Sequence, residues 1–306
     1  AASQLARRVS EDWQAHFGVR PLLMETLVGE GFRGTSYRAA NWHWVGWTQG
    51  RGRMARRLRP AHQKLSQDLI RSGAVYADET SWWVGEPGWW LWVLTDPETI
   101  LYRVEPHRSA RIVKDLLGPH FAGTLVSDCL ATYNTLPYRQ HKCIAHHLKV
   151  ISELSEGVQG PAAQYLSQWK LLFLSVLAVH HQAIEDQPQI SPHLRSQFQQ
   201  WSDRLLDNPV VDPAAKTIRQ RLHKQRPHLL QCLADVAVEP TNNRAERALH
   251  PAVIARKISC GNKTINGKRT WEILASLTAT YRLRGLDFVD SVSPFLTLHP
   301  PKPPPR

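Results

Sequence analysis

The sequence predicts an α/β fold in which a mixed sheet with helices is interrupted by an all-helical insertion. Short runs rich in branched and aromatic residues, separated by turn signals, fill residues 75–128 and are typical of strands. From about residue 148 to residue 233, apolar residues recur at helical spacing instead. Acidic residues form the third observation: they interrupt the first and last strand-like runs and return on a helix after the helical stretch.

The first predicted strand, Val75–Val84, holds Asp78 within an otherwise apolar and aromatic run. Two turn signals, Gly85-Glu86-Pro87-Gly88 and Asp96-Pro97-Glu98-Thr99, fold the next two strands back on it as a meander. A helix over residues 109–117 then leads to a fourth strand with a buried pattern. The remaining strands are predicted at residues 89–95, 100–104 and 123–128.

Three strands in a meander, then a helix and a fourth strand, are the opening of a ribonuclease H-like fold. That architecture brings an acid of the first strand beside an acid of the fourth, and a later helix supplies a third acid. Here these positions are Asp78, Asp128 and Glu246. An acid in a buried strand is unfavourable unless something pairs with it, and a bound cation is the expected partner. We therefore expect the three carboxylates to converge as catalytic residues and metal ligands.

Three carboxylates suit the cleavage of a phosphodiester by in-line attack. Two Mg²⁺ ions about 3.5–4 Å apart can clamp the attacking and departing oxygens of such a reaction. Magnesium prefers hard oxygen ligands, and Mn²⁺ is expected to substitute for it. The run Cys143-Ile-Ala-His146-His147 could instead supply zinc ligands. No second cluster at ligand spacing completes a zinc site in the sequence, so a packed Cys143 beside a helix start is the preferred interpretation.

Charge is distributed unevenly along the chain, whose net charge is +12. Residues 1–75 carry 12 Lys/Arg against 5 Asp/Glu, and residues 240–306 carry 11 against 4, so each end has a net charge of +7. Residues 76–239 have a net charge of −2. Basic ends around a nearly neutral centre indicate a polyanion held against the core, although a merely basic soluble protein has the same composition.

Basic residues that could contact DNA phosphates lie in two regions. The first is the Gly-, Arg- and aromatic-rich stretch 45–53, whose composition equally suits a structured loop. The second surrounds Glu246, where some cations could reach DNA while the acid faces inward, and where a solvated charged face is the plain alternative. The predicted DNA-binding residues are Arg51, Arg53, Arg244, Arg247, Arg256 and Lys257.

Further polar side chains are candidates for accessory roles. His146 opens a predicted helix after the second acid and could donate to a phosphate, although a packed or capping histidine is the commoner case. Asn242 and Asn243 would cap the helix of Glu246, orient that acid or touch the substrate. Glu79 points to the strand face opposite the first acid, which favours a supporting or surface role.

The chain divides at changes of composition. A predicted helix over residues 56–72 follows the Gly/Arg-rich stretch, so we place a boundary at Gly50–Arg53. The expected organisation is a partial N-terminal segment (1–53), the first part of the catalytic domain (54–150), the helical insertion (151–239), the last part of the catalytic domain (240–292) and a Pro-rich tail (293–306) that is expected to be disordered.

Four motifs resemble the catalytic region of insertion sequence 66 family transposases. They are YADETSW, LVSDCLATYN, CIAHHLK and EPTNNRAERALHPAVIARKISCG, which occur in order within about residues 54–292. The resemblance implies a DDE transposase that nicks the ends of its element and joins the freed 3′-hydroxyls to target DNA. It implies that Asp78, Asp128 and Glu246 are the first, second and third acids, with a helical insertion before the third. DNA ends, target DNA, a homo-oligomer on DNA and an accessory transposition protein are the partners it suggests.

Residues 9–53 resemble the end of the Druantia-associated domain of unknown function 4338, through FRGTSYRAANW and VGWTQGRGR. This piece stands where the transposase family normally carries DNA-binding and zinc-binding segments, so a recombined or truncated element is expected. Three alternatives to a strand-transfer enzyme stay open: an inactive DNA-binding relic, a hydrolytic nuclease or resolvase on the same fold, and a zinc-stabilised interaction module.

Composition also bears on location. No run approaches about 18 apolar residues, so no membrane span or membrane partner is expected. The start, Ala1-Ala2-Ser3-Gln4, lacks the layout of a signal peptide. Four scattered cysteines without a C-x-x-C pair argue against a disulfide framework. We expect a bacterial cytoplasmic protein that associates with the nucleoid when it is on DNA.

Overall fold

A computed structural model describes residues 52–185 and 189–296, together with residues 11, 12, 14 and 15. Contacts divide the chain into two units, residues 1–50 and 51–306, and the elements named here belong to the second. Arg51, most of residues 9–53, for which a resemblance to domain 4338 is expected, and the Pro-rich residues 300–305 lie outside the described part.

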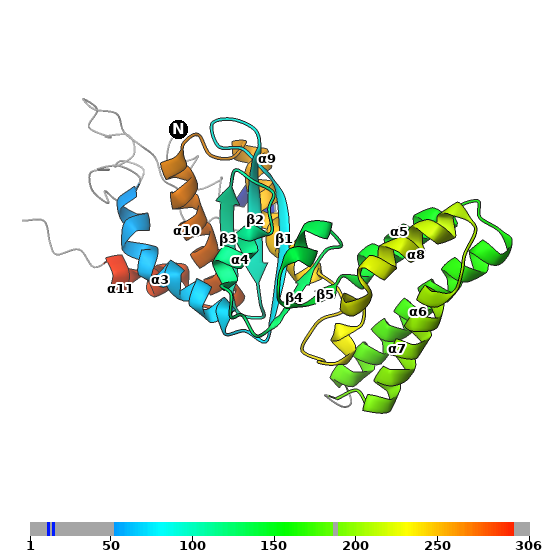
Figure 1. Cartoon of the computed structure of the whole chain (residues 1–306). Helices are drawn as coiled ribbons and strands as arrows, with labels where there is room; N and C mark the ends of the chain where they lie inside the picture. The colour runs from blue at the N-terminus through cyan, green and yellow to red at the C-terminus, as the bar shows by residue number, and fades with distance from the viewer. Residues whose placement is uncertain (1–10, 13, 16–51, 186–188, 297–306) are drawn as a thin grey trace, which may run out of the picture. The chain divides into compact units, whose positions relative to one another are not determined.

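The second unit is built on a five-stranded mixed sheet with the strand order β3-β2-β1-β4-β5 (Figure 1). β1, β2 and β3 form an antiparallel meander, and β4 and β5 continue from β1 in parallel. The predicted mixed α/β class is confirmed, as is the return of the fourth strand beside the first. The strands are β1 (Ala74–Trp82), β2 (Trp89–Thr95), β3 (Ile100–Glu105), β4 (Thr124–Ser127) and β5 (Arg139–Lys142).

Both faces of the sheet are covered. Because side chains alternate along each strand, neighbouring residues of one strand face different cores. Val75 of β1 faces a cluster that includes α3 (Gly52–Ile70) and α4 (Arg111–Leu117). Its neighbour Tyr76 faces a second cluster, which includes α9 (Asn243–Ser259) and the helices that follow β5. The two cores lie on opposite sides of one sheet, so any side chain of β1 belongs to one or the other by its position in the strand.

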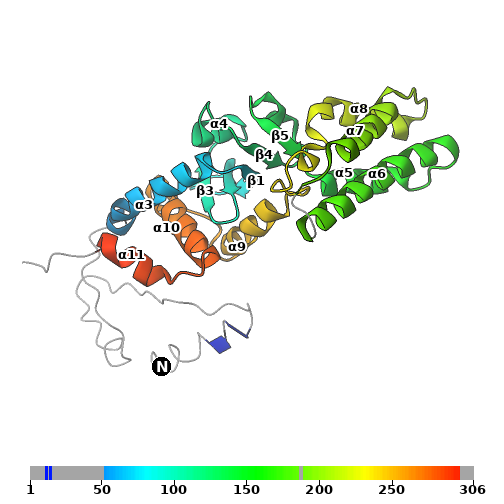
Figure 2. The same ribbon diagram turned by 90° about the horizontal axis from the view of Figure 1, so that it is seen from below.

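An all-helical stretch separates β5 from α9, and its helices lie together beyond the β5 edge of the sheet (Figures 1 and 2). The apolar stripe predicted for the longest of them is buried, with Trp169 and Phe173 fully enclosed. Ser191 and Asp212 cap two of these helices, each ahead of a proline, as the sequence chemistry favours. The helices are α5 (Ile144–Ser155), α6 (Gly160–Glu185), α7 (Pro192–Asp207) and α8 (Pro213–Lys224), followed by short 3₁₀ turns at Arg226–His228 and Gln231–Leu233.

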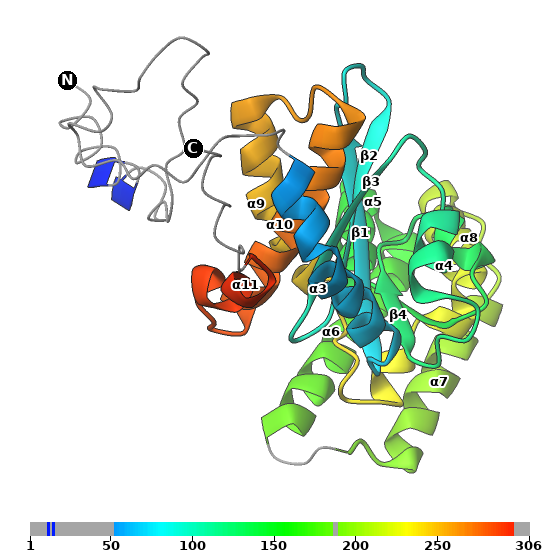
Figure 3. The same cartoon turned by 90° about the vertical axis from the view of Figure 1, so that its left-hand side faces the viewer.

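α10 (Ile265–Leu283) covers the outer edge of β3, which would otherwise expose unpaired amides (Figures 1 and 3). Three side chains of α10, spaced four residues apart, accept from alternate amides of β3. Glu272 Oε1 accepts from Val104 (2.6 Å), Ser276 Oγ from Tyr102 (2.9 Å) and Thr280 Oγ1 from Ile100 (3.0 Å). The match arises because four helical residues and two strand residues both rise about 6–7 Å.

Replacing Thr280 with valine keeps the shape of the side chain and removes both of its hydrogen bonds to Ile100. We expect the free energy of unfolding to fall by about 1–3 kcal/mol, because a backbone amide loses its partner. Urea unfolding measures this change. Thr217→Val is the matched control, since that hydroxyl bonds to its own helix at an exposed position. Equal stability of Thr280→Val and the wild-type chain would mean that water can satisfy this edge.

Three elements differ from the predictions. β5 has the sequence Arg-Gln-His-Lys, which carries no strand pattern. The helix predicted over residues 242–249 continues as α9 to Ser259, through Pro251, because its buried stripe continues to Ala252. α11 (Phe288–Leu296) forms where no element is predicted and lies on both sides of the expected boundary at residue 292. Within the described residues, no helix is long and apolar enough to cross a membrane.

Candidate active site

Asp78 and Asp128 occupy equivalent places on two neighbouring parallel strands. The register pairs Ala77 of β1 with Ser127 of β4, so each aspartate directly follows a paired residue. Parallel strands lie about 4.8 Å apart. The residues two positions earlier in each strand face the cluster that contains α9, and alternation directs both aspartates to the same side. β1 and β4 therefore bring the two carboxylates side by side.

Glu246 reaches this side of the sheet from the first turn of α9. The helix packs on β1 and β2. Its buried stripe consists of Ala245, Ala248, Leu249 and Ala252. The side chain of Glu246 is 46% exposed, so it lies at the border between the packed face of the helix and solvent. A substrate could therefore approach this carboxylate without any rearrangement of the core.

The three carboxylates are close enough to interact electrostatically. Burial raises the pKa of Asp78 from its usual 3.8 to about 7. The amide of Glu79, which donates to Asp78 Oδ1 at 2.9 Å, opposes this rise in pKa. The charges of Glu79, Asp128 and Glu246 raise the pKa further. Acids that repel one another in a partly buried site are favourable partners for a cation, so the donor set fits a hard divalent metal ion.

Hydrogen bonds to the sheet lead the chain from the helical stretch back to α9. The Glu239 amide donates to Tyr76 Oη on β1 (2.8 Å). Pro240 O accepts from the Ile144 amide (3.0 Å) and from Nε2 of His141 on β5 (3.2 Å). These contacts hold the segment that directly precedes α9. The long helical stretch therefore does not displace the third acid from the two aspartates.

Asn242 ties the start of α9 to the strand that carries Asp78. Its Nδ2 donates to Ala77 O (2.9 Å), and its backbone amide donates to Cys143 Sγ (3.2 Å). Asn242 occupies the N-cap position of α9, but its side chain makes no capping hydrogen bond, so the predicted side-chain cap is absent. Asn243 is the exposed first residue of the helix. Asn242 thus fixes where α9 begins relative to β1.

Glu79 faces the other side of the sheet and is buried, with 8% of its surface exposed. Tyr133 Oη donates to Glu79 Oε2 (2.6 Å), and Arg108 pairs with Oε1 (2.9 Å). Burial raises the pKa of Glu79, and these two partners oppose the rise. The surface alternative for Glu79 is therefore wrong, and its contacts are those of a residue that supports the strand beneath Asp78.

Lys142 is a buried cation behind the aspartates that carries no sequence signal. Its Nζ donates to Ser127 Oγ (3.0 Å) and lies 5.2 Å from the centre of the Tyr133 ring. Burial lowers the pKa of Lys142 to about 8, whereas the charge of Asp128 opposes this shift. A lysine at the end of the run Arg-Gln-His-Lys has the pattern of an exposed residue, so only the fold reveals it beside the site.

Two of the predicted DNA-binding residues of α9 are occupied by contacts within the protein. Arg244 pairs with Glu239 and lies over the ring of Tyr76 at 5.4 Å. Arg256 donates to Ser81 Oγ on β1 (2.9 Å). These arginines help to fix the two ends of α9 on the sheet. Their positive charge remains near the acids, but guanidinium donors of both arginines already bind groups of the protein.

The other predicted cations are placed differently. Arg247 and Lys257 are exposed on α9, and their side chains make no hydrogen bond or ion pair with any described residue. Arg53 belongs to the first turn of α3, and its side chain lies outside the described part, as does all of Arg51. Among the predicted DNA-binding residues whose side chains are described, Arg247 and Lys257 are therefore the two whose charge is available to a ligand.

His146 and His147 have different surroundings although they are neighbours in sequence. The His147 ring is fully buried and stacks on Phe173, with ring centres 5.4 Å apart. His146 instead has its Nδ1 atom 4.0 Å from Glu246 Oε1. One histidine packs in the core, and the other faces the third acid.

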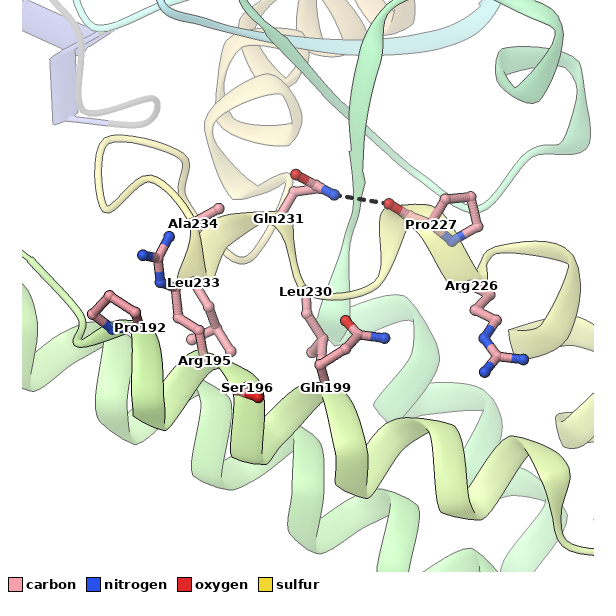
Figure 4. Close-up of a pocket in the computed structure, with 10 residues that line it drawn as sticks. All are labelled: Pro192, Arg195, Ser196, Gln199, Arg226, Pro227, Leu230, Gln231, Leu233 and Ala234. Atoms are coloured by element: carbon pink, nitrogen blue, oxygen red, sulfur yellow. Dashed lines mark hydrogen bonds between the residues drawn. The ribbon is translucent and has the colours of Figure 1, made fainter.

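A pocket of about 640 Å³ lies among the helices between α7 and the 3₁₀ turns (Figure 4). Arg195, Leu230 and Leu233 are among its lining residues, and the Gln231 side chain donates to Pro227 O (2.9 Å) within the lining. None of the three acids lines it. The candidate active site is thus marked by converging charges and not by this cavity.

Comparisons with known proteins agree with the resemblance of the motifs. The family model described as "Transposase IS66 family" matches residues 47–270. Two proteins of Sinorhizobium fredii are similar. Uncharacterized protein y4qI is 28% identical over 256 residues (73% of this chain and 47% of that protein), and uncharacterized protein y4jD is 27% identical over 274 residues (77% and 52%). The chain spans about half the length of these curated relatives. Because the family match covers most of the chain and all three acids, the chain belongs to the IS66 transposase family.

Proposed function

We propose that the chain carries the catalytic part of a DDE-type transposase with a ribonuclease H-like core. It would nick DNA at the ends of an insertion sequence and join the freed strand to target DNA. The observation that carries the proposal is the convergence of Asp78, Asp128 and Glu246 from β1, β4 and α9 on one side of the sheet. Membership of the family and the order of the strands support it.

The three acids would hold two divalent cations, Mg²⁺ as the expected ion and Mn²⁺ as a substitute. When bound, these ions activate the attacking oxygen and offset the charge on the leaving oxygen of a phosphodiester. The chain itself orients the ligands. Asp78 Oδ1 accepts the amide of Glu79, and Asp128 Oδ1 accepts the amide of Leu130, each at 2.9 Å. These bonds fix each carboxylate and leave its second oxygen for a cation.

DNA would approach along the exposed side of α9. Arg247 directly follows Glu246 in the first turns of the helix, and Lys257 lies in the last turn. Cations at these positions would contact backbone phosphates and hold a strand across the acids. The same proposal includes element ends and target DNA as substrates, a homo-oligomer that brings two ends together, an accessory transposition protein, and action on the nucleoid in a bacterial cytoplasm.

Replacing Arg247 and Lys257 together with alanine should weaken DNA binding on any sequence. For each phosphate that the variant no longer neutralises, the slope of log affinity against log salt concentration should become shallower by about one, because fewer counterions are released. Fluorescence anisotropy over a salt series measures the slope. Lys114→Ala is the control, since that lysine is exposed on α4, a helix that packs on the other side of the sheet. An unaltered slope in the double variant would remove these residues from the DNA-binding surface.

Replacing Asn242 with alanine should reduce DNA cutting by about 10–100-fold, the usual effect of losing a group that supports a metal ligand. The hydrogen bond to Ala77 O that anchors α9 would be absent, and Glu246 would no longer be held beside the aspartates. DNA affinity should stay close to wild type, which separates misplacement from loss of binding. Asn208→Ala, at the exposed end of α7, is the control. Full activity of Asn242→Ala would show that α9 is held by its packing alone.

The proposed function is tested with the purified chain, labelled DNA from the ends of its own element, a target plasmid and Mg²⁺. Nicking followed by joining of the label to the plasmid is the expected result. Nicking without joining would favour a hydrolytic nuclease. Salt-sensitive binding without nicking would favour a DNA-binding relic.

A further inference from the structure

Cys143, His146 and Glu246 bring a sulfur, a nitrogen and an oxygen ligand together. One ligand atom from each residue lies within 4.8 Å of the other two. Cys143 is the N-cap residue of α5, and His146 lies in the first turn of that helix. Glu246 comes from the first turn of α9, far along the chain. The fold thus supplies a third ligand to a Cys-x-x-His pair that the sequence leaves incomplete.

The positions of these three residues resemble those of ligands in a cation site. The spacing of the cysteine and histidine at a helix start puts both on one face. His146 Nδ1 is buried, has no hydrogen-bond partner among the described residues, and lies 4.0 Å from Glu246 Oε1. The sulfur of Cys143 is buried and accepts the amide of Asn242 (3.2 Å). Zinc–ligand bonds of about 2.0–2.3 Å put ligand atoms roughly 3.5 Å apart, so movements of about 1 Å would close the group around an ion.

The chemistry of these ligands selects the ion. Thiolate and imidazole ligands favour a borderline-soft cation such as Zn²⁺ over Mg²⁺. Binding would release the thiol proton of Cys143 to solvent, while His146 would bind through neutral Nδ1 and Glu246 through its carboxylate. Three protein ligands leave a fourth position for water. This ligand set differs from the all-oxygen set of the three acids, yet the two sets share Glu246.

We propose that Cys143, His146 and Glu246 bind a zinc-class cation, which draws Glu246 away from Asp78 and Asp128. Because one carboxylate cannot complete both ligand sets, Zn²⁺ would oppose the reaction that Mg²⁺ supports. The cation site stands on its own geometry, whereas its inhibitory effect rests on the proposed function. A cell or a purified preparation rich in Zn²⁺ would then hold the protein in a state that does not cut.

Titration of the metal-free full chain with Cd²⁺ tests the site without DNA. A bound thiolate produces an ultraviolet charge-transfer band, and one equivalent of Cd²⁺ is expected to produce it and Zn²⁺ to displace it. Cys143→Ser should lose the band, and His146→Ala should bind at least about tenfold more weakly. Cys260→Ser removes an exposed thiol at the end of α9 and should retain the band as a matched control. Asp78→Asn should also retain it, since Asp78 is not a ligand.

Retention of the band in Cys143→Ser, or wild-type affinity in His146→Ala, would overturn the site. His146→Ala alone decides the question if Cys143→Ser does not fold, because the His146 side chain is 38% exposed and its removal is expected to leave the fold intact. Loss of binding in Asp78→Asn would place the cation at the aspartates and overturn the site as well.

In the cutting assay, Zn²⁺ should stop the Mg²⁺ reaction and a zinc chelator should restore it. Cutting that continues at saturating Zn²⁺ would overturn the inhibitory role, whereas a band without any Mg²⁺-dependent cutting would overturn only the proposed function.

Discussion

Replacing Asp78 with asparagine is expected to abolish metal-dependent DNA cutting while DNA affinity stays close to wild type. The amide keeps the size of the side chain but removes the charge that a divalent cation requires. Losing an outer partner of a metal site lowers activity by about 10–100-fold, so losing a ligand should exceed that range. Asp128→Asn and Glu246→Gln should behave alike, because their carboxylates act on the same site. Single-turnover cutting and anisotropy binding measure the two effects separately.

Two exposed acids provide matched controls for these changes of charge. Asp115→Asn on α4 and Glu185→Gln on α6 alter side chains that are 61% and 62% exposed and belong to neither the sheet nor α9. Both should cut at the wild-type rate. If one of the three site variants also cuts, that residue does not belong to the site. If the controls fail as well, the assay reports net charge and not the site.

The metal-free protein is expected to lose stability as pH rises from about 4 to 7, and Asp78 should account for much of the loss. Its pKa is about 7 in the fold against a usual 3.8. Below pH 3.8 the carboxyl is protonated in both states and brings no penalty. Between pH 3.8 and 7 the unfolded carboxyl ionises while the folded carboxyl keeps its proton beside three other acids, so the unfolded state is favoured increasingly. Above pH 7 the carboxyl is ionised in both states and the loss of stability is complete. At about 1.4 kcal/mol per pKa unit, the difference reaches up to roughly 4 kcal/mol at alkaline pH.

Urea unfolding at about pH 5.5 and pH 8.5, with a chelator present, measures this effect. Asp78→Asn should be more stable than the wild-type chain at the higher pH and should differ less at the lower one. Added Mg²⁺ should restore stability to the wild-type chain and not to the variant, because the ion binds the folded state. A variant that is no more stable than the wild-type chain at alkaline pH would mean that the carboxylates of the site do not repel one another.

Local patterns are enough to predict β1 to β4 and the two aspartates. Apolar alternation and Gly/Pro turn signals depend only on residues that are close in sequence, and they suffice to place Asp78 and Asp128 on paired strands. β5 could not be predicted in this way, because its residues are polar. Gln140 Nε2 donates to Tyr133 O (2.8 Å) and Leu136 O (3.0 Å), and such partners make the burial of a polar strand possible only in the finished fold.

The surroundings of Glu246 are even harder to predict from local patterns. Its place on a helix after the insertion and its family motif both predict this residue as the third acid. Its position depends on contacts between distant parts of the chain, such as the bond from Asn242 to Ala77. The burial of Glu79 and the approach of His146 to Glu246 depend on the same long-range packing. Sequence patterns therefore predict which carboxylates are the candidate ligands, whereas the residues that hold them in place emerge only from the structure.

Anomalous diffraction from crystals soaked in Mn²⁺ tests the central claim most directly. The proposed function predicts Mn²⁺ peaks bounded by Asp78, Asp128 and Glu246, and it predicts that Asp78→Asn crystals lack them. A protein that shows no peak among these carboxylates at concentrations that support cutting would contradict it. So would a peak found only beside Cys143 and His146.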